Sequence, residues 1–332
     1  MPPSTSRQTP PRTQVQAPAG SMLADAVSVS VLREKKVKMC VYGRNRTGKT
    51  TLAAQFPKPL LFISTEPDER GGMGSVVSAT GAVLQRVSHK LLGQDADGQW
   101  VDANDPKCVR KDRLKGSEKL LGLFAELCGP HPFKTVVLDT VTSYQELCLV
   151  EIMGWDAPPA IHPNAKAVGK DNYQYRAEKW RKNLTPLLDV TNCHVIVLAQ
   201  EKDHNPEKDD FGGRNKLIGR ERLESFIAPA VGSTNAQWIA DNCNYIVQLF
   251  EAEVMQDLVV PTIDPMTGAA AEPIIQKVGT GVRQRHLRLL SHPNYAAGGR
   301  WDFDRNIPEF VTAKTPKELY AALAAFIPAL KG

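Results

Sequence analysis

Short apolar runs alternate with amphipathic segments along the first two-thirds of the chain. The runs at residues 36–42, 59–64, 132–138 and 194–199 are continuous, as is typical of strands buried on both faces. Between and after these strands, residues 50–55, 117–128, 143–153 and 173–190 are expected to be helical, the last helix being interrupted near Pro186. This alternation predicts an α/β fold with a mostly parallel sheet flanked by helices.

The remaining third of the chain has a different pattern. β-like runs at residues 245–250, 258–261, 274–278 and 282–290 predict extra strands at one edge of the sheet, and residues 316–326 predict a final helix. The polar, acidic segment 93–105 is expected to be an exposed excursion. Residues 1–23 are rich in Pro, Ser, Thr and Gln and are expected to be disordered. Residues 24–332 then form one domain that includes the C-terminal β-rich extension and the final helix.

The composition is that of an ordinary globular protein, with 42% hydrophobic and 23% charged residues among 332. No apolar run approaches the ~20 residues that span a bilayer, and the N-terminus lacks the layout of a secretory signal. We therefore expect a cytoplasmic protein without a membrane partner. The six cysteines include no C-x-x-C pair, which argues against a zinc site or a disulfide framework. The net charge of +5 permits a polyanionic partner but does not require one.

One motif is highly specific. The run Gly43-Arg44-Asn45-Arg46-Thr47-Gly48-Lys49-Thr50 has the spacing G-x-x-x-x-G-K-T of a phosphate-binding loop, between an apolar strand and a helix that begins near Gly48 and continues through Thr51. In such a loop, backbone N–H groups surround the phosphates, the lysine reaches the terminal phosphates and the threonine hydroxyl holds Mg²⁺. ATP and Mg²⁺ are therefore the expected cofactors. The alternative is a glycine-rich surface turn with a solvated lysine.

Three polar residues follow predicted strands and are candidates for chemistry. Asp139 ends the third strand, where a Mg²⁺-coordinating carboxylate is needed, although it could instead cap the next helix. Glu66 ends the second strand and could activate the water that attacks the γ-phosphate, or be a solvated loop residue. Gln200 ends the fourth strand and could sense the γ-phosphate, or be an ordinary loop residue. Parallel strands bring these three carboxyl ends to one rim of the sheet.

The order and spacing of these motifs resemble the core of RecA-like P-loop ATPases. Within that class, the chain is most similar to the short phage-encoded RecA-like proteins that act in single-strand annealing and recombination. The resemblance covers roughly residues 36–290. It implies that Lys49 and Thr50 bind phosphate and Mg²⁺, and that Asp139 is the Walker B acid. It further implies that Glu66 is the catalytic base and Gln200 the switch residue.

The resemblance also implies a DNA partner, because two loops contact DNA in RecA-like proteins. The first loop would hold Lys166 and Lys170, and the helix beside it adds residues such as Tyr173, Lys179 and Trp180. The second loop would hold Arg214, Lys216, Arg220 and Arg222. Cations interleaved with aromatics suit single-stranded DNA, although basic runs are often only solvated faces and helix aromatics are often core.

Assembly is a further implication of the resemblance. RecA-like assemblies insert paired cations into the ATP site of the neighbouring subunit, and Arg283 and Arg285 are the candidates for this trans finger. The alternative is that they are charged residues that keep an edge strand from aggregating. The expected assembly is a homo-oligomer, either a ring or a filament, with other recombination or replication proteins as further partners.

The leading interpretation is therefore a Mg²⁺-dependent ATPase that binds single-stranded DNA as a multimer in phage-type recombination, DNA repair or annealing, in the host cytoplasm if phage-encoded. One alternative is an ATP-liganded annealing or loading module with little hydrolysis. The other is a small-molecule P-loop kinase, which the positions of Glu66 and Gln200 disfavour because both suit water activation.

Overall fold

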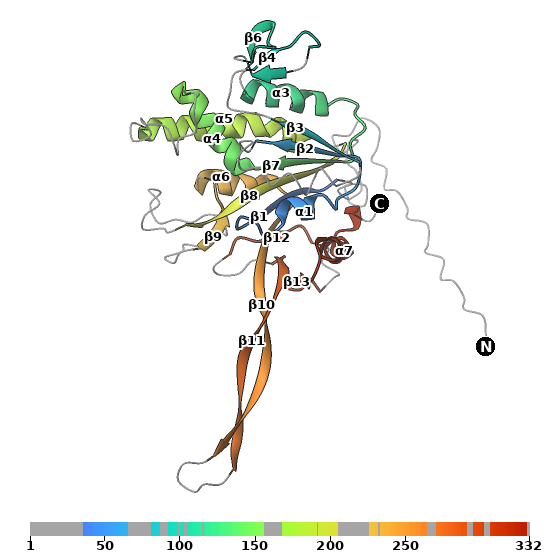
Figure 1. The fold of residues 1–332 in the computed structure, drawn as a ribbon, viewed down its shortest axis with the longest axis vertical. Coiled ribbons are helices and arrows are strands. Elements are labelled where there is room, and N and C mark those ends of the chain that lie inside the picture. Colours follow the sequence, from blue (N-terminus) through green and yellow to red (C-terminus); the bar gives the residue numbers. More distant parts are fainter. Residues whose placement is uncertain are drawn as a thin grey trace, which may run out of the picture. The chain divides into compact units, whose positions relative to one another are not determined.

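The central feature of this computed structural model is one mixed β-sheet with helices on both faces (Figure 1). The described residues are 36–65, 81–86, 92–98, 100–102, 105–114, 116–155, 168–190, 192–204, 226–231, 233–263, 270–290, 295–301 and 306–330. Residues 1–35 lie outside this set, so the disorder expected for residues 1–23 and the domain start at residue 24 stay predictions.

The sheet has the strand order β13-β11-β10-β1-β8-β7-β2-β3. Its strands are β1 (Lys38–Gly43), β2 (Leu60–Ser64), β3 (Ala82–Arg86), β7 (Thr135–Asp139), β8 (His194–His204), β10 (Tyr245–Ile263), β11 (Ala270–Arg288) and β13 (Phe310–Ala313). All neighbours from β10 through β3 are parallel, whereas β11 and β13 add on antiparallel. The predicted fold class, a mostly parallel sheet between helices with extra C-terminal strands, is confirmed.

Alternate residues of the buried strands supply two separate cores. In β1, Cys40 and Tyr42 face one hydrophobic cluster, while Met39 and Val41 face the other. The first cluster is closed by α3 (Gly116–Leu127), α4 (Val141–Met153), α5 (Lys170–Asp189) and α6 (Ser233–Asn242). The second is closed by α1 (Lys49–Ala53), α7 (Pro316–Phe326) and the 3-10 helix η4 (Pro328–Leu330). Burial on both faces explains why these strands read as continuous apolar runs.

Smaller strands complete the described structure. β9 (Phe226–Pro229) pairs antiparallel with the end of β8, and β12 (Gly298–Gly299) pairs with β10. β4 (Leu92–Gln94), β5 (Trp100–Asp102) and β6 (Arg110–Leu114) form a separate antiparallel sheet. The expected excursion at residues 93–105 therefore contains strands, which its polar sequence does not indicate.

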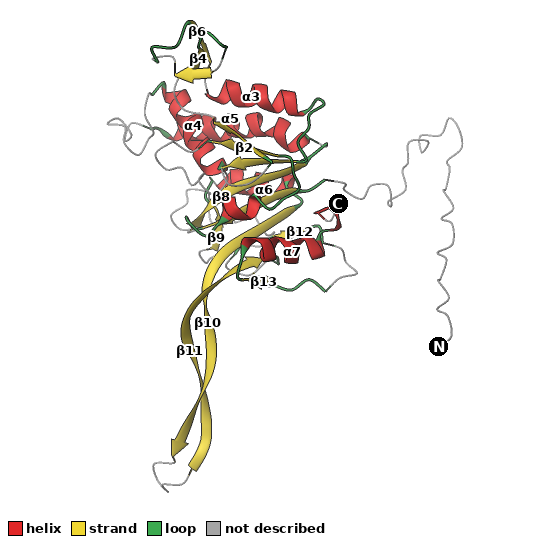
Figure 2. Cartoon of the chain, turned by 45° about the vertical axis from the view of Figure 1, so that its right-hand side comes forward, coloured by secondary structure: helices red, strands yellow, loops and turns green. Residues whose placement is uncertain are grey.

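Several sequence-based boundaries need correction. The four β-like runs after residue 245 are parts of only two strands, β10 and β11, which form one long hairpin (Figure 2). α5 is not interrupted at Pro186 but continues to Asp189, so the proline lies within its last turn. The expected final helix has the predicted bounds, because Thr315 and Glu318 form a capping box at its start.

Among the described residues, none of the helices combines the length and apolar character needed to cross a membrane. None of the six cysteines, all of which are among the described residues, forms a disulfide; Cys40, Cys148, Cys193 and Cys243 are buried, Cys108 is half-buried and Cys128 is exposed.

Candidate functional site

The two motif glycines occupy backbone positions that other residues would strain. Gly43 is the last residue of β1, and a Cβ there would lie 2.1 Å from the carbonyl oxygen of Leu249 in β10. Gly48 has a left-handed backbone with φ of 95° immediately before α1, and glycine adopts that conformation without steric cost. The loop from residue 43 to residue 48 therefore depends on glycine at both ends, as a phosphate-binding loop does.

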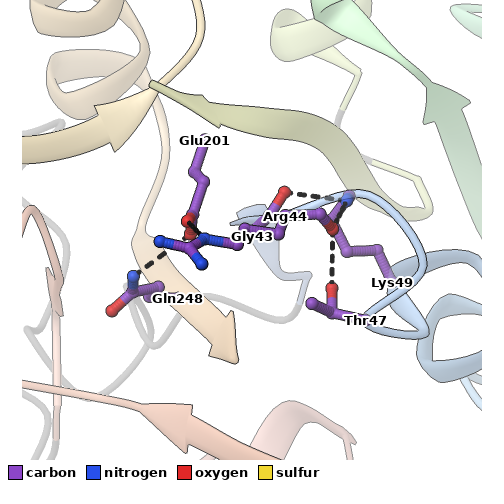
Figure 3. A network of polar contacts seen from close by, with 6 residues as sticks. All are labelled: Gly43, Arg44, Thr47, Lys49, Glu201 and Gln248. Carbon is purple, nitrogen blue, oxygen red and sulfur yellow. Dashed lines mark hydrogen bonds and ion pairs between the residues drawn. The ribbon is translucent and has the colours of Figure 1, made fainter. Parts of the chain in front are cut away.

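Lys49 turns its side chain back onto this loop. Its Nζ donates hydrogen bonds of 2.9 Å to the carbonyl oxygen of Gly43 and 2.7 Å to that of Arg44 (Figure 3). The hydroxyl of Thr47 donates to the same Arg44 oxygen at 3.0 Å. A phosphate oxygen carries a charge that these carbonyl oxygens lack, so it is the stronger acceptor for this buried ammonium group.

Thr50 and Asp139 meet beside this lysine. The Thr50 hydroxyl donates a 2.7 Å hydrogen bond to Oδ2 of Asp139, the last residue of β7. Burial raises the pKa of the Asp139 carboxyl, while the Thr50 hydrogen bond and the charge of Lys49 partly offset this. A hydroxyl and a carboxylate side by side provide the hard oxygen ligands that Mg²⁺ prefers. The residues present therefore fit a Mg²⁺ ion with bound phosphates.

The adjacent residues fix the ends of β2 and β7 to each other. The Thr65 hydroxyl donates to the carbonyl oxygen of Thr140 at 2.7 Å and accepts from the Thr140 N–H at 3.2 Å. Thr140, rather than Asp139, caps α4, because its hydroxyl accepts from the Ser143 N–H at 3.0 Å. The Asp139 carboxylate is therefore not used as a helix cap. Glu66, which follows Thr65 in the chain, lies outside the described residues.

Gln200 lies within β8, which continues four residues further to His204. It pairs in register with Gly43 of β1, and its N–H donates to the Thr142 hydroxyl at 3.1 Å. These contacts fix the Gln200 backbone beside the start of the phosphate-binding loop. Its expected role in sensing the γ-phosphate stays a prediction.

A largely buried carboxylate connects the loop to β8 and β10. Arg44 donates from Nε to Oε1 of Glu201 at 2.6 Å, and Gln248 donates to Oε2 at 3.4 Å (Figure 3). The Glu201 side chain is only 10% exposed, whereas that of Arg44 is 78% exposed. A pocket of about 390 Å³ opens next to this pair, and its lining residues are Arg44, Asn45, Gln200, Glu201 and Ile227. Its volume lies within the range of small-molecule sites.

Arg285 approaches the phosphate-binding loop from β11 of the same chain. Its Nε donates to the carbonyl oxygen of Thr47 at 3.2 Å, and a terminal guanidinium nitrogen lies 3.2 Å from Oε1 of Glu251. A Cβ at Gly48 would lie 3.3 Å from the same Nε. Arg285 thus contacts its own chain's loop, while Arg283 is exposed two residues earlier. Insertion of either cation into a neighbour's site stays a prediction.

Comparison with known proteins identifies the family. The AAA_24 family model, described as an AAA domain, matches residues 35–301. The chain belongs to this family of AAA domains. No curated protein sequence matches significantly.

Two solved structures are similar to this AAA domain. The RadB recombinase structure has 14% sequence identity and a TM-score of 0.31, over 85% of this chain and 88% of that chain. The flagellar accessory protein FlaH from Methanocaldococcus jannaschii has 8% identity and a TM-score of 0.33, over 85% and 89% of the two chains.

One of the six basic residues expected to contact DNA is among the described residues of the AAA domain. Lys170 is the first residue of α5. The other candidates, Lys166, Arg214, Lys216, Arg220 and Arg222, lie outside the described residues. Further along α5, Trp180 is fully buried and donates to the carbonyl oxygen of Val141 at 3.1 Å, so it cannot stack on a base. Lys179 forms an ion pair with Glu151 of α4 at 2.5 Å, so the charge of Lys179 is paired within the AAA domain.

The site also contains contacts that the sequence does not predict. In the sequence, Glu201 is recognisable only as a charged residue after an apolar strand, because its contact with Arg44 spans 157 positions. The contact of Arg285 with its own loop depends on the register that pairs it with Glu251 across the hairpin.

Proposed function

We propose that this AAA domain is a Mg²⁺-dependent ATPase that binds single-stranded DNA as a multimer. The observation that carries the nucleotide assignment is the Thr50–Asp139 hydrogen bond of 2.7 Å beside the buried Lys49. Lys49 would pair with the terminal phosphates, and Thr50 and Asp139 would hold Mg²⁺. Bound Mg²⁺ would neutralise charge on the β- and γ-phosphates. The residues 43–51 surround the phosphates in this proposal.

Hydrolysis is assigned to Glu66 as the base that deprotonates the attacking water. The hydrogen bonds between Thr65 and Thr140 support this role, because they hold Thr65, the residue before Glu66 in the chain, next to Asp139. Substituting Glu66→Gln retains size and hydrogen bonding but removes the basic oxygen. ATP turnover should then fall ~10²-fold or more with ATP binding retained. Unchanged turnover would assign the base to another residue.

The DNA assignment rests on the basic residues Lys166, Lys170, Arg214, Lys216, Arg220 and Arg222 and on the RecA-like resemblance. Gln200 precedes the segment that contains the last four of these and is held beside Gly43. We infer that a γ-phosphate at the loop changes the position of Gln200 and thereby DNA affinity. This chemistry fits recombination or annealing of the phage type, in the cytoplasm and with other recombination or replication proteins.

Fluorescence anisotropy of a labelled oligonucleotide tests the DNA assignment. We expect tighter binding with ATP than with ADP, and affinity that falls steeply with salt, because phosphate contacts release counterions. Replacing Arg214, Lys216, Arg220 and Arg222 with Ala should flatten the salt dependence. The matched control removes four exposed lysines elsewhere, namely Lys58, Lys107, Lys314 and Lys317.

Each outcome of this experiment and of a parallel turnover assay has a definite meaning. Identical DNA binding with ATP, with ADP and without nucleotide would contradict the Gln200 switch. DNA binding without turnover would support the ATP-liganded annealing module, and phosphate transfer to a small molecule would support a kinase. Absence of DNA binding at low salt would contradict the nucleic-acid assignment and leave an ATPase with another partner.

A further inference from the structure

The hairpin of β10 and β11 extends past the central sheet as a two-stranded ribbon (Figures 1 and 2). β10 pairs with β1 only from Tyr245 to Gln248, after which its pairing continues with β11 alone up to Ile263. We call residues 253–263 of β10 and 270–283 of β11 the distal ribbon. Every residue from Ile274 to Arg283 is exposed, so this part of β11 is exposed on both faces.

The distal ribbon concentrates the exposed apolar side chains of the molecule. Seven of the twelve exposed large hydrophobic residues in the described part of the chain belong to it: Met255, Leu258, Val259, Ile274, Ile275, Val278 and Val282. The register pairs Val259 with Ile275 and Leu258 with Gln276, so both faces carry aliphatic groups. A contiguous exposed apolar surface of this kind marks an interaction site.

Polar groups of the distal ribbon form hydrogen bonds within the ribbon. The Gly281 N–H donates to Oε1 of Glu253 at 2.6 Å, and the Thr280 hydroxyl donates to the carbonyl oxygen of Val254 at 2.9 Å. These bonds set the register at the irregularity between Glu253 and Met255. Since a two-stranded hairpin is marginally stable alone in water, a further packed surface is needed to stabilise the ribbon.

The composition of the ribbon lacks the basic surplus that a polyanionic partner needs and favours another copy of this chain. The distal ribbon contains three acidic and two basic residues, a net charge of −1, and no aromatic residue. Such a surface has no net positive charge to attract a nucleic acid or an anionic lipid surface, and it has no aromatic ring to stack on bases. The total of +5 leaves +6 on the rest of the chain, so the ribbon of one copy and the remainder of another carry charges of opposite sign.

The size of the ribbon matches what a specific interface requires. At ~3.3 Å per residue, residues 253–263 extend over roughly 36 Å, and two strands with their side chains are roughly 10 Å wide. The two faces together therefore offer roughly 700 Å². A standard interface buries about 800 Å² on each partner.

We propose that the distal ribbon is the self-association surface of this protein and that a second copy of the chain covers it. This inference deepens the proposed function, because it rests on assembly into multimers and names the surface that carries it. The sequence-based candidates for contact between subunits are Arg283, the last residue of the distal ribbon, and Arg285 beyond it, whereas the contact proposed here is made by the apolar side chains of the ribbon.

Two kinds of variant test the proposal by analytical ultracentrifugation over a concentration series, with and without Mg-ATP. In the first, Asn-Gly replaces residues 253–283 and joins Ala252 to Gln284, which face each other in the register. The Glu251–Arg285 pair remains. In the second, Leu258→Lys and Ile275→Lys place one charge on each face. Val109→Lys, at a 62% exposed position outside the ribbon, is the matched control.

We expect the parent and Val109→Lys to form multimers, and both ribbon variants to remain monomeric at concentrations at least tenfold higher. All variants should bind Mg-ATP, which separates loss of assembly from loss of the nucleotide site. A photo-crosslinking residue in place of Ile275 should join two copies of the chain. A parent that stays monomeric, or ribbon variants that assemble as the parent does, would overturn the proposal. ATP turnover by such a monomer would leave the ATPase assignment intact.

Discussion

Thr50 and Asp139 are 89 positions apart in the chain, yet the Thr50 hydroxyl donates a 2.7 Å hydrogen bond to the Asp139 carboxylate. β1 is followed by the phosphate-binding loop, which leads to Thr50, and β7 ends at Asp139. β8 lies between β1 and β7 in the sheet. The strand order therefore brings the end of the loop motif to the carboxylate. Burial of this carboxylate raises its pKa, so the charged form is costly until a cation approaches.

Substituting Asp139→Asn should stabilise the nucleotide-free protein while removing its response to Mg²⁺. The amide retains an oxygen that accepts from Thr50 but avoids the cost of a buried charge. A gain of ~1 kcal/mol would raise Tm by about 1–3 °C in a domain of this size. Thr50→Val is the matched opposite, because it leaves the carboxylate without its donor, and Tm should fall. Differential scanning fluorimetry with and without Mg-ATP measures both. A lower Tm for Asp139→Asn would contradict this account of the site.

Glu201 should compete with nucleotide phosphates for Arg44. In the structure, the Arg44 guanidinium is exposed and its Nε is paired with the largely buried Glu201 carboxylate at 2.6 Å. Glu201→Gln weakens this pairing, so Arg44 should be free to approach a phosphate. We expect Mg-ATP affinity to rise about 2–5-fold, the effect of an ion pair worth ~0.5–1 kcal/mol. Isothermal titration calorimetry measures the change, with Arg44→Ala as the counterpart that should weaken binding. Weaker binding by Glu201→Gln would show that Glu201 orients Arg44 for the ligand.

Gly43→Ala should strongly destabilise the protein because of the approach of β10. The added Cβ would lie 2.1 Å from the carbonyl oxygen of Leu249, which is backbone and cannot rotate away. A loss of ~3 kcal/mol or more in unfolding free energy is expected, as for other severe overpacking. Gly122→Ala in α3 is the control, since its Cβ meets nothing within 4 Å. That control should stabilise by ~0.5–1 kcal/mol through helix propensity. Urea unfolding of both variants gives the comparison.

His194 should make stability depend on pH. Burial and the nearby charge of Lys36 lower the pKa of His194 to about 4, and its Nδ1 accepts from the Val37 N–H at 3.1 Å. Because the folded pKa lies below the ordinary value of about 6.5, the stabilisation is fully present above pH 6.5 and is lost as pH falls toward 4. Unfolding followed by circular dichroism from pH 7.5 to 4 should show this loss. His194→Asn retains an acceptor without the titration, so its stability should fall less over this window. Parallel profiles would contradict the role of His194.

The elements predicted correctly are those whose local pattern is determined by burial. The strands at β1, β2, β7 and β8 are apolar because both faces are covered, and α7 is marked by its own cap. The hairpin was divided into four short strands because residues such as Gln256 and Thr280 interrupt its apolar pattern. Strand pairing across the hairpin, which no local pattern encodes, joins these pieces.

The residues of the site fall into the same two groups: those that a local pattern marks and those that long-range strand pairing positions. The loop glycines, Lys49, Thr50 and Asp139 were recognisable because a motif or a strand end marks them. The contacts of Glu201 and Arg285 with the loop depend on long-range register, and sequence spacing carries no information on it. The pairing of Gly43 with Gln200 follows from strand order, which alternation of strands and helices does not specify.

Equilibrium binding of Mg-ATP to the parent and to Lys49→Ala tests the central claim most directly. The ammonium group of Lys49 donates hydrogen bonds to the loop carbonyl oxygens of Gly43 and Arg44, and we assign it to the terminal phosphates. Calorimetry should show saturable Mg-ATP binding to the parent and a loss of at least tenfold in affinity for Lys49→Ala, with the Tm of each variant confirming that it is folded. A folded Lys49→Ala that binds Mg-ATP as tightly as the parent, or a parent that does not bind it, would contradict the account.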